Sequence, residues 1–156
     1  CGNGKNILKQ FECQFELCDL TETFMTIVSN RYPSAGTSMA NALNLPYRTA
    51  KFDTVLSIAV LHHLNSYSAR LQMLKELIRV GSCNGIILIT VWALGGKSKD
   101  CYVPWTIPNT GETIQRFYHM FSLDEIKKLL LEEILTYKYC DIYWDHNNYI
   151  VTIYLE

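Results

Sequence analysis

Two nearly continuous apolar runs, residues 52–61 and 85–92, are the strongest signal along the chain. Such runs are typical of strands buried on both faces of a sheet, and we expect residues 52–61 to form a central strand. Residues 66–80 place Leu and Ile on one side and charged residues elsewhere, which predicts an amphipathic helix. Gly81 follows directly and is expected to end this helix.

The preceding segments continue this alternation of helices and strands. We predict a glycine turn with a short helix over residues 2–10 and a strand over residues 15–18. Residues 21–32 are expected to form a second helix, stopped by Pro33, and residues 37–40 a weak strand. The order favours an α/β fold, a doubly wound Rossmann-like parallel sheet with helices on both faces.

Three further elements are predicted after residue 92. Residues 95–115 are rich in Gly, Lys, Pro and Thr without periodicity and are expected to form a long loop. Ser122-Leu-Asp-Glu has the pattern of a capping box, so a helix should begin there. Residues 134–144 and 149–155 flank a polar turn, which predicts a carboxyl-terminal antiparallel hairpin.

Composition narrows the class of protein. With 156 residues, 49% of them hydrophobic, the chain is expected to form a single domain over residues 1–156. A net charge of −1 gives no overall electrostatic reason to bind a polyanion. The six cysteines include no Cys-x-x-Cys pair, and we predict no metal site. Apolar runs fall short of the roughly 20 residues that span a bilayer, so we expect a cytoplasmic protein, with the nucleus as an alternative.

Two features near the start of the chain favour a nucleoside cofactor. Cys1-Gly-Asn-Gly is half of a glycine-rich loop that lets backbone N–H groups approach a ligand. Asp19 ends the next predicted strand, where a carboxylate can accept both ribose hydroxyl groups. Each feature has an ordinary alternative, because glycines and acids are common in turns.

The order of motifs resembles that of class I S-adenosylmethionine methyltransferases. The glycine loop and Asp19 are followed by Asn41-Ala-Leu-Asn-Leu-Pro, then Phe52-Asp, then Leu61-His-His-Leu. This resemblance implies S-adenosylmethionine as the cofactor, and Asn41, which replaces the usual Asp, would face the adenine amine. The residues that it assigns to cofactor binding are Gly2, Gly4, Asp19, Leu20, Asn41, Ala42 and Ala59.

Later motifs narrow the resemblance. Val91-Trp-Ala-Leu, Tyr102-Val-Pro-Trp and Arg116-Phe-Tyr-His resemble the tRNA wobble-uridine carboxymethyl methyltransferases. That family implies methylation of 5-carboxymethyluridine in tRNA and a heterodimer with a small zinc-binding activator subunit, which would pair with the edge strand at residues 37–40. The family's first strand has no counterpart here, so we expect an amino-terminally incomplete domain.

Ester formation itself suggests which residues act. A carboxylate is already ionised near neutral pH, so the site needs a clamp that orients it more than it needs a base. Arginine suits this task because its guanidinium forms two parallel hydrogen bonds. We predict Arg116 as the clamp, with His63, His62 and His119 as further donors. The alternatives are a surface cation for Arg116 and capping or packing roles for the histidines.

Two other functions stay open at this stage. A class I methyltransferase of a small molecule fits the near-neutral charge, and a degenerate methyltransferase kept as a scaffold subunit fits Asn41 and the abrupt start. Cofactor binding would separate the scaffold from both enzymes. Methylation of tRNA would separate the two enzymes from each other.

Overall fold

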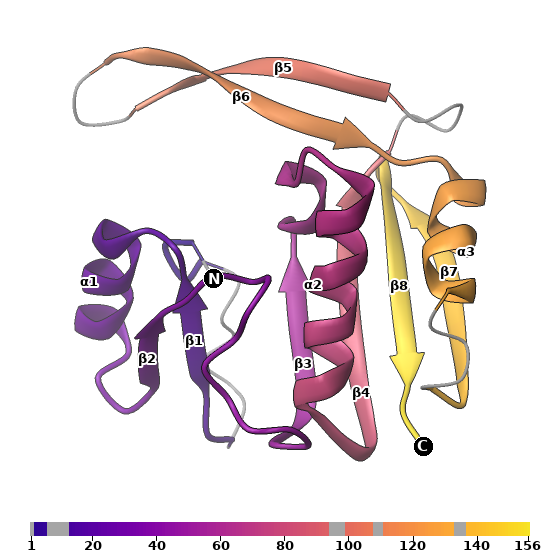
Figure 1. The fold of residues 1–156 in the computed structure, drawn as a ribbon. Coiled ribbons are helices and arrows are strands. Elements are labelled where there is room, and N and C mark those ends of the chain that lie inside the picture. Colours follow the sequence, from indigo (N-terminus) through magenta and orange to yellow (C-terminus); the bar gives the residue numbers. More distant parts are fainter. Residues whose placement is uncertain (1, 6–12, 94–98, 108–110, 133–136) are drawn as a thin grey trace. The chain divides into compact units, whose positions relative to one another are not determined.

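The computed structural model describes residues 2–5, 13–93, 99–107, 111–132 and 137–156 (Figure 1). Contacts group the chain into two compact units, Cys1–Pro46 and Tyr47–Glu156. Among the described residues, the first unit contains one sheet and the second contains two. No described helix is long and apolar enough to cross a membrane.

The first unit is a parallel strand pair connected by a helix. Its elements are β1 (Glu16–Asp19), α1 (Glu22–Arg31) and β2 (Gly36–Met39). Leu17 from β1 packs with Met25 and Val28 from α1 in a small core. The two predicted strands and the predicted helix are therefore confirmed. Residues 2–5 form turns, whereas most of the helix predicted over residues 2–10 lies outside the described part of the chain.

The second unit contains a four-stranded mixed sheet in the order β3-β4-β8-β7. Strands β3 and β4 are parallel, and β8 is antiparallel to both β4 and β7. The bounds of these strands are Phe52–Ile58 for β3, Gly81–Trp92 for β4, Tyr139–Asp145 for β7 and Asn148–Tyr154 for β8. Contrary to the sequence prediction, β3 lies at the end of this order, and Leu56 on it is 54% exposed.

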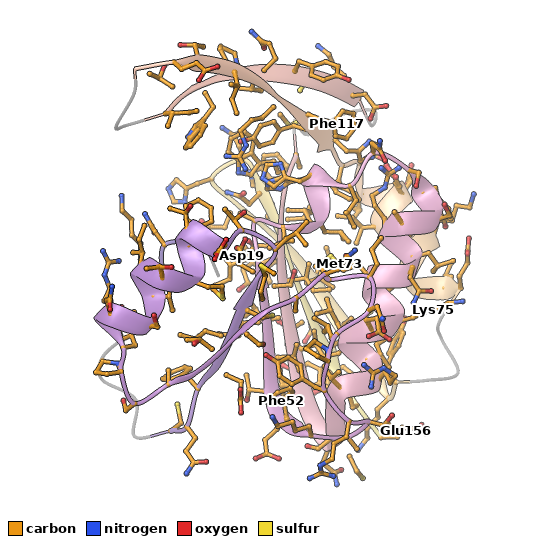
Figure 2. The ribbon with its side chains drawn as sticks, turned by 60° about the vertical axis from the view of Figure 1, so that its left-hand side comes forward. Asp19, Phe52, Met73, Lys75, Phe117 and Glu156 are labelled. Atoms are coloured by element: carbon orange, nitrogen blue, oxygen red, sulfur yellow. The ribbon has the colours of Figure 1, made fainter. Side chains whose placement is uncertain are left out.

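Two helices cover one face of this sheet, α2 (Tyr67–Val80) and α3 (Leu123–Leu131). The hydroxyl groups of Ser66 and Ser122 accept hydrogen bonds from N–H groups three residues later and so cap the two helices. Met73 points from α2 toward the strands and is 2% exposed, whereas Lys75 points away (Figure 2). The predicted amphipathic helix and the predicted start at Ser122 are confirmed.

Gly81 ends α2 without a left-handed conformation, since its φ is −69°. A Cβ atom at this position would lie 2.3 Å from Cδ1 of Leu155. The predicted helix end at Gly81 is confirmed, and the glycine also makes room for Leu155.

The carboxyl-terminal hairpin of β7 and β8 is confirmed. His146 and Asn147 form its turn with φ values of 42° and 63°. Two successive left-handed residues give a turn whose twist matches that of the flanking strands.

The predicted loop over residues 95–115 is wrong for its described part. Residues Lys99–Thr106 form β5, which pairs antiparallel with β6 (Thr113–Met120) as a separate two-stranded ribbon. Its half-buried residues Cys101, Val103 and Trp105 alternate with exposed ones. This period of two is characteristic of a strand, and exposed Lys, Asp and Pro residues conceal it in the sequence.

Candidate functional site

The glycine turn and Asp19 meet in the first unit, as expected from the sequence. Gly2 and Gly4 have φ values of 54° and 74°, which non-glycine residues rarely adopt. The Gly2 N–H donates to Oδ2 of Asp19 at 2.8 Å, and the Thr21 N–H donates to Oδ1 at 3.0 Å. The turn is also fixed to the end of α1, because the Tyr32 hydroxyl donates to the Gly4 carbonyl at 3.0 Å.

These contacts determine the charge of Asp19. Partial burial would raise the pKa of its carboxyl group, but the hydrogen bonds from Gly2 and Thr21 lower it, and the net effect is a lowered pKa. The side chain is therefore an ionised acceptor at neutral pH, at the carboxyl end of β1. That is the position and charge state suited to binding hydroxyl groups of a nucleoside.

The other predicted cofactor residues of this unit offer a mixed surface. Leu20 is 67% exposed directly after Asp19, which is unusual for a large apolar side chain at a turn. Oδ1 of Asn41 accepts the Leu43 N–H at 2.9 Å in a local turn, and Ala42 is half-buried. The Asn41 side chain is exposed, and its amide group also carries a hydrogen-bond donor.

Ala59 follows β3 in the second unit and has a strained backbone. Its φ is 57°, a conformation that costs a residue with a Cβ roughly 1–2 kcal/mol. The Ala59 N–H lies 3.1 Å from the carbonyl oxygen and 3.0 Å from the hydroxyl group of Thr90. Strain of this kind concentrates at functional sites.

The two adjacent histidines have different environments. His62 is 1% exposed, and its Nδ1 accepts the Trp92 N–H at 3.1 Å. Burial, reinforced by the charges of His63 and Arg116, lowers the pKa of His62 to about 3. His62 is therefore a neutral ring that supports the end of β4.

His63 instead contacts the predicted clamp. Its Nδ1 lies 3.1 Å from the Phe117 carbonyl oxygen, and its Nε2 lies 3.4 Å from Nη2 of Arg116. The 3₁₀ turn Leu61–His63 after β3 brings His63 to β6, which carries Arg116. Of the three predicted histidines, His63 lies within hydrogen-bond distance of Arg116, and the His62 ring packs against His63 with ring centroids 4.5 Å apart.

His119 is engaged by two carboxylates. Nδ1 lies 2.6 Å from Asp100 on β5, and Nε2 lies 2.6 Å from Glu125 on α3. Glu125 also pairs with Arg70 of α2 at 3.2 Å. Both ring nitrogens of His119 are therefore engaged by carboxylate oxygens. His119 thus joins the ribbon to the helices, and neither of its nitrogens is directed to a ligand.

An aromatic cluster surrounds these side chains and was not predicted from the sequence. Trp92 and Tyr118 stack with ring centroids 4.5 Å apart, and the His63 ring meets Tyr118 edge-on at 4.5 Å. The guanidinium carbon of Arg116 lies 5.2 Å from the centre of the Trp105 ring. The motif Tyr102-Val-Pro-Trp was the available signal for Trp105, but nothing in it indicates which residue the ring would contact.

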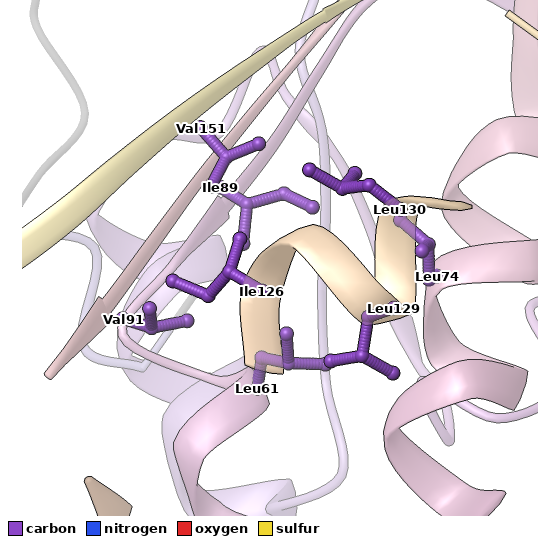
Figure 3. A pocket seen from close by; sticks show the side chains of 8 residues that line it. All are labelled: Leu61, Leu74, Ile89, Val91, Ile126, Leu129, Leu130 and Val151. Atoms are coloured by element: carbon purple, nitrogen blue, oxygen red, sulfur yellow. The ribbon is translucent and has the colours of Figure 1, made fainter. Parts of the chain in front are cut away.

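A small cavity in the second unit lies elsewhere and is apolar. It has a volume of about 20 Å³ between α2, α3 and the sheet (Figure 3). Its lining residues are Leu61, Leu74, Ile89, Val91, Ile126, Leu129, Leu130 and Val151. A space of this size holds at most about one water molecule and offers it no polar partner, so it is a packing gap in the core.

The methyltransferase domain family matches residues 1–89, more than half of the chain. The chain belongs to this family of S-adenosylmethionine-dependent methyltransferases. It is 39% identical to a tRNA (carboxymethyluridine(34)-5-O)-methyltransferase of Arabidopsis thaliana over 68% of this chain and 26% of that protein. It is 31% identical to the protein of that name from Schizosaccharomyces pombe, over 83% of this chain and 68% of the relative.

Solved structures support the same fold. A SAM-dependent methyltransferase from Methanosarcina mazei superposes with a TM-score of 0.67 over 90% of this chain and 81% of that one, at 17% identity. At this identity the likeness establishes the fold alone. The chain spans about a quarter of the length of the Arabidopsis methyltransferase.

S-adenosylmethionine is the cofactor of this family, and residues of the first unit fit it. The ionised Asp19 carboxylate matches ribose hydroxyl groups, and the exposed Leu20 offers an apolar surface to a purine ring. The glycine turn brings the backbone beside Asp19, and its glycines have no side chains that would block a ligand. When bound, the cofactor supplies an electrophilic methyl group on a sulfonium sulfur.

Proposed function

We propose that the protein containing this chain methylates the carboxylate of 5-carboxymethyluridine at the wobble position of tRNA and so forms the methyl ester. The tRNA methyltransferases of Arabidopsis thaliana and Schizosaccharomyces pombe, by their names, act on carboxymethyluridine 34. Their similarity to this chain supports the same substrate here.

The surroundings of the Arg116 side chain are the main structural support for this proposal. Its guanidinium is half-buried beside His63 and Trp105, and among the described residues no carboxylate pairs with it. A partly buried arginine without an acidic partner is a binding site for an anion. The carboxylate of the substrate would supply that anion and would be held by two parallel hydrogen bonds.

The chemistry requires little else from the chain. The substrate carboxylate is ionised near neutral pH, so no residue would have to remove a proton. Its oxygen would form the new bond to the methyl carbon as the carbon–sulfur bond breaks, and the sulfur would leave as a neutral thioether. Arg116 orients the carboxylate, because rotation of this group would move the attacking oxygen out of line with the bond that breaks. The neutral ring of His62 adds no charge nearby.

We also propose the residues that hold the cofactor. Asp19 would bind the ribose hydroxyl groups, Leu20 and Ala42 would contact the adenine ring, and Gly2 and Gly4 would let the backbone approach the amino-acid part. Asn41 would face the adenine amine, and Ala59 would line the methyl-transfer region. The glycine turn, the ionised Asp19 and the strained Ala59 support these roles.

We further propose a heterodimer with a small zinc-binding activator subunit. Strand β2 pairs with β1 and with no other described strand, so its second edge suits pairing with a partner, as unpaired edges are prone to do. A net charge of −1 is consistent with phosphate contacts made outside this chain. A cytoplasmic location, with the nucleus as the alternative, fits this role in tRNA modification.

Methyl transfer to tRNA tests the proposal. Labelled S-adenosylmethionine is incubated with tRNA bearing carboxymethyluridine and with the full protein, alone and with the activator subunit. The label should enter tRNA and should leave as methanol after mild alkali, because a methyl ester hydrolyses and an N-methyl group does not. Alkali-stable label, or no label despite cofactor binding, would contradict the ester reaction.

Arg116→Ala should lower kcat/KM for tRNA at least about a hundredfold, comparable to the loss of a charged group that orients reacting atoms. The dissociation constant for S-adenosylmethionine should stay within about twofold. Arg48→Ala is the matched control, because Arg48 is an exposed arginine of the same unit and should leave both quantities unchanged. A large loss of cofactor binding in Arg116→Ala would remove Arg116 from the clamp role.

A further inference from the structure

One face of the β5–β6 ribbon carries Arg116 together with Val103 and Trp105. Val103 pairs with Arg116, and Trp105 pairs with Ile114, two residues before Arg116. Trp105 and Arg116 are therefore diagonal neighbours on the same face of the ribbon. Tyr102 lies on the opposite face and is 68% exposed.

The Arg116 guanidinium lies against aromatic rings. Its carbon is 5.2 Å from the centre of the Trp105 ring and 6.0 Å from that of Tyr118. A guanidinium within about 6 Å of an aromatic ring is attracted to the ring face. The Trp105 contact therefore restricts where the long, otherwise flexible arginine side chain can point.

His63 holds the same guanidinium through one nitrogen. A carbonyl oxygen only accepts, so the contact with Phe117 places the hydrogen of His63 on Nδ1. The lone pair on Nε2 then accepts from Nη2 of Arg116. Burial lowers the pKa of His63, the Phe117 carbonyl opposes this, and the charge of Arg116 lowers it further, so the ring remains a neutral acceptor.

The partners of Arg116 differ from those of the other half-buried or buried arginines of this unit. Arg70 pairs with Glu125 and Arg79 with Glu76, so the charges of both are largely compensated. Arg116 is held by an aromatic face and a neutral nitrogen. Such partners fix the guanidinium in place and leave its charge available to an anion.

We propose that Trp105 and His63 are positioning residues that together present the Arg116 guanidinium to the substrate carboxylate. The inference rests on the proposed function for the identity of that carboxylate. Trp105 acts through Arg116 and does not stack on a base of the tRNA. His63 accepts from Arg116 and does not donate to the substrate.

Steady-state kinetics of the full protein distinguish a positioning role of Trp105 from direct contact with tRNA. Trp105→Leu should lower kcat for tRNA methylation about tenfold through loss of the cation–π contact, with the affinity for S-adenosylmethionine unchanged. Trp105→Phe keeps an aromatic face and should restore kcat to within about threefold of the wild type. Tyr102→Leu, on the opposite face of the ribbon, is the control and should leave kcat unchanged. A raised KM with unchanged kcat in Trp105→Leu would overturn the proposal, because it would indicate direct contact with tRNA.

NMR of the arginine Nε–Hε groups tests the geometry independently of any tRNA activity, with the Arg116 signal assigned by its loss in Arg116→Lys. Trp105→Leu should shift this signal, because the ring current of Trp105 is removed, and Tyr102→Leu should not. Acetate serves as a carboxylate probe and should shift the Arg116 signal more in the wild type than in Trp105→Leu. If the wild type forms no ester but the acetate response holds, the proposed substrate fails and the positioning role stands. An Arg116 signal that Trp105→Leu leaves unchanged would overturn the inference itself.

Discussion

Asp19 illustrates how backbone contacts prepare a single side chain for a ligand. The N–H groups of Gly2 and Thr21 bind its two oxygens separately, which fixes the plane of the carboxylate. Its lowered pKa keeps it ionised. An ionised carboxylate only accepts hydrogen bonds, which suits ribose hydroxyl groups as donors.

Asp19→Asn should therefore weaken S-adenosylmethionine binding about tenfold to a hundredfold, the range expected when charge-assisted hydrogen bonds are lost. The amide would also place an N–H₂ group against a backbone N–H group. Isothermal titration calorimetry measures the change, with Asp141→Asn on β7 as an exposed control. If Asp19→Asn binds the cofactor as tightly as the wild type, Asp19 does not belong to the site.

For single residues, the sequence predicted which side chains belong to the candidate site better than it predicted the role of each one. His62 and His63 are adjacent and could not be ranked, because their difference comes from Trp92 and Phe117, which approach from two other strands. His119 was expected to act as a donor, but its partner Asp100 lay in a segment predicted to be a loop. Contacts between distant segments determine each of these outcomes, and periodicity within one segment carries no information about them.

The β5–β6 ribbon is the element that carries the clamp, and a buried network holds it to the helices. Glu125 on α3 connects His119 on β6 with Arg70 on α2. The side chains of Arg70 and Glu125 are 7% and 14% exposed. Removing one charge from such a pair leaves the other buried without compensation, which costs about 3–5 kcal/mol.

Glu125→Gln should accordingly lower the free energy of unfolding by about 3 kcal/mol. Asp124→Asn is the matched control, since Asp124 is an exposed acid in the same helical turn and should cost well under about 1 kcal/mol. Urea denaturation of both variants gives the comparison. If both variants lose the same free energy of unfolding, the buried network contributes no more to stability than an exposed acid at the start of a helix does.

Elements with a strong apolar pattern were the most predictable. Strands β3, β4 and β8 and helix α2 contain apolar residues at the spacing of their own secondary structure, so their positions followed from the sequence. The ribbon was missed because it has no core of its own and exposes polar residues on one face. Strand β6 contacts the turn Leu61–His63 and β4, and no local pattern in the sequence reveals these contacts.

For the whole molecule, the most informative titratable group is the buried ring of His62. Its pKa is about 3 in the folded protein, compared with an ordinary value of 6.5. Below pH 6.5 the unfolded chain therefore binds a proton at this ring and the folded protein does not. The free energy of unfolding falls as the pH falls, by up to about 1.4 kcal/mol per pH unit, until the folded ring also titrates near pH 3.

Urea denaturation at pH 7.5 and pH 5.0 measures this contribution of His62. His62→Asn retains an acceptor for the Trp92 N–H and removes the titrating group. Between the two pH values the wild type should lose about 2 kcal/mol more stability than His62→Asn, since roughly 1.5 pH units of that interval lie below the ordinary pKa. Any packing loss in the variant is present at both pH values and cancels in the difference. If both proteins show the same pH dependence, the pKa of His62 is the same in the folded and the unfolded protein. The conclusion that His62 is a neutral ring near Arg116 would then be wrong.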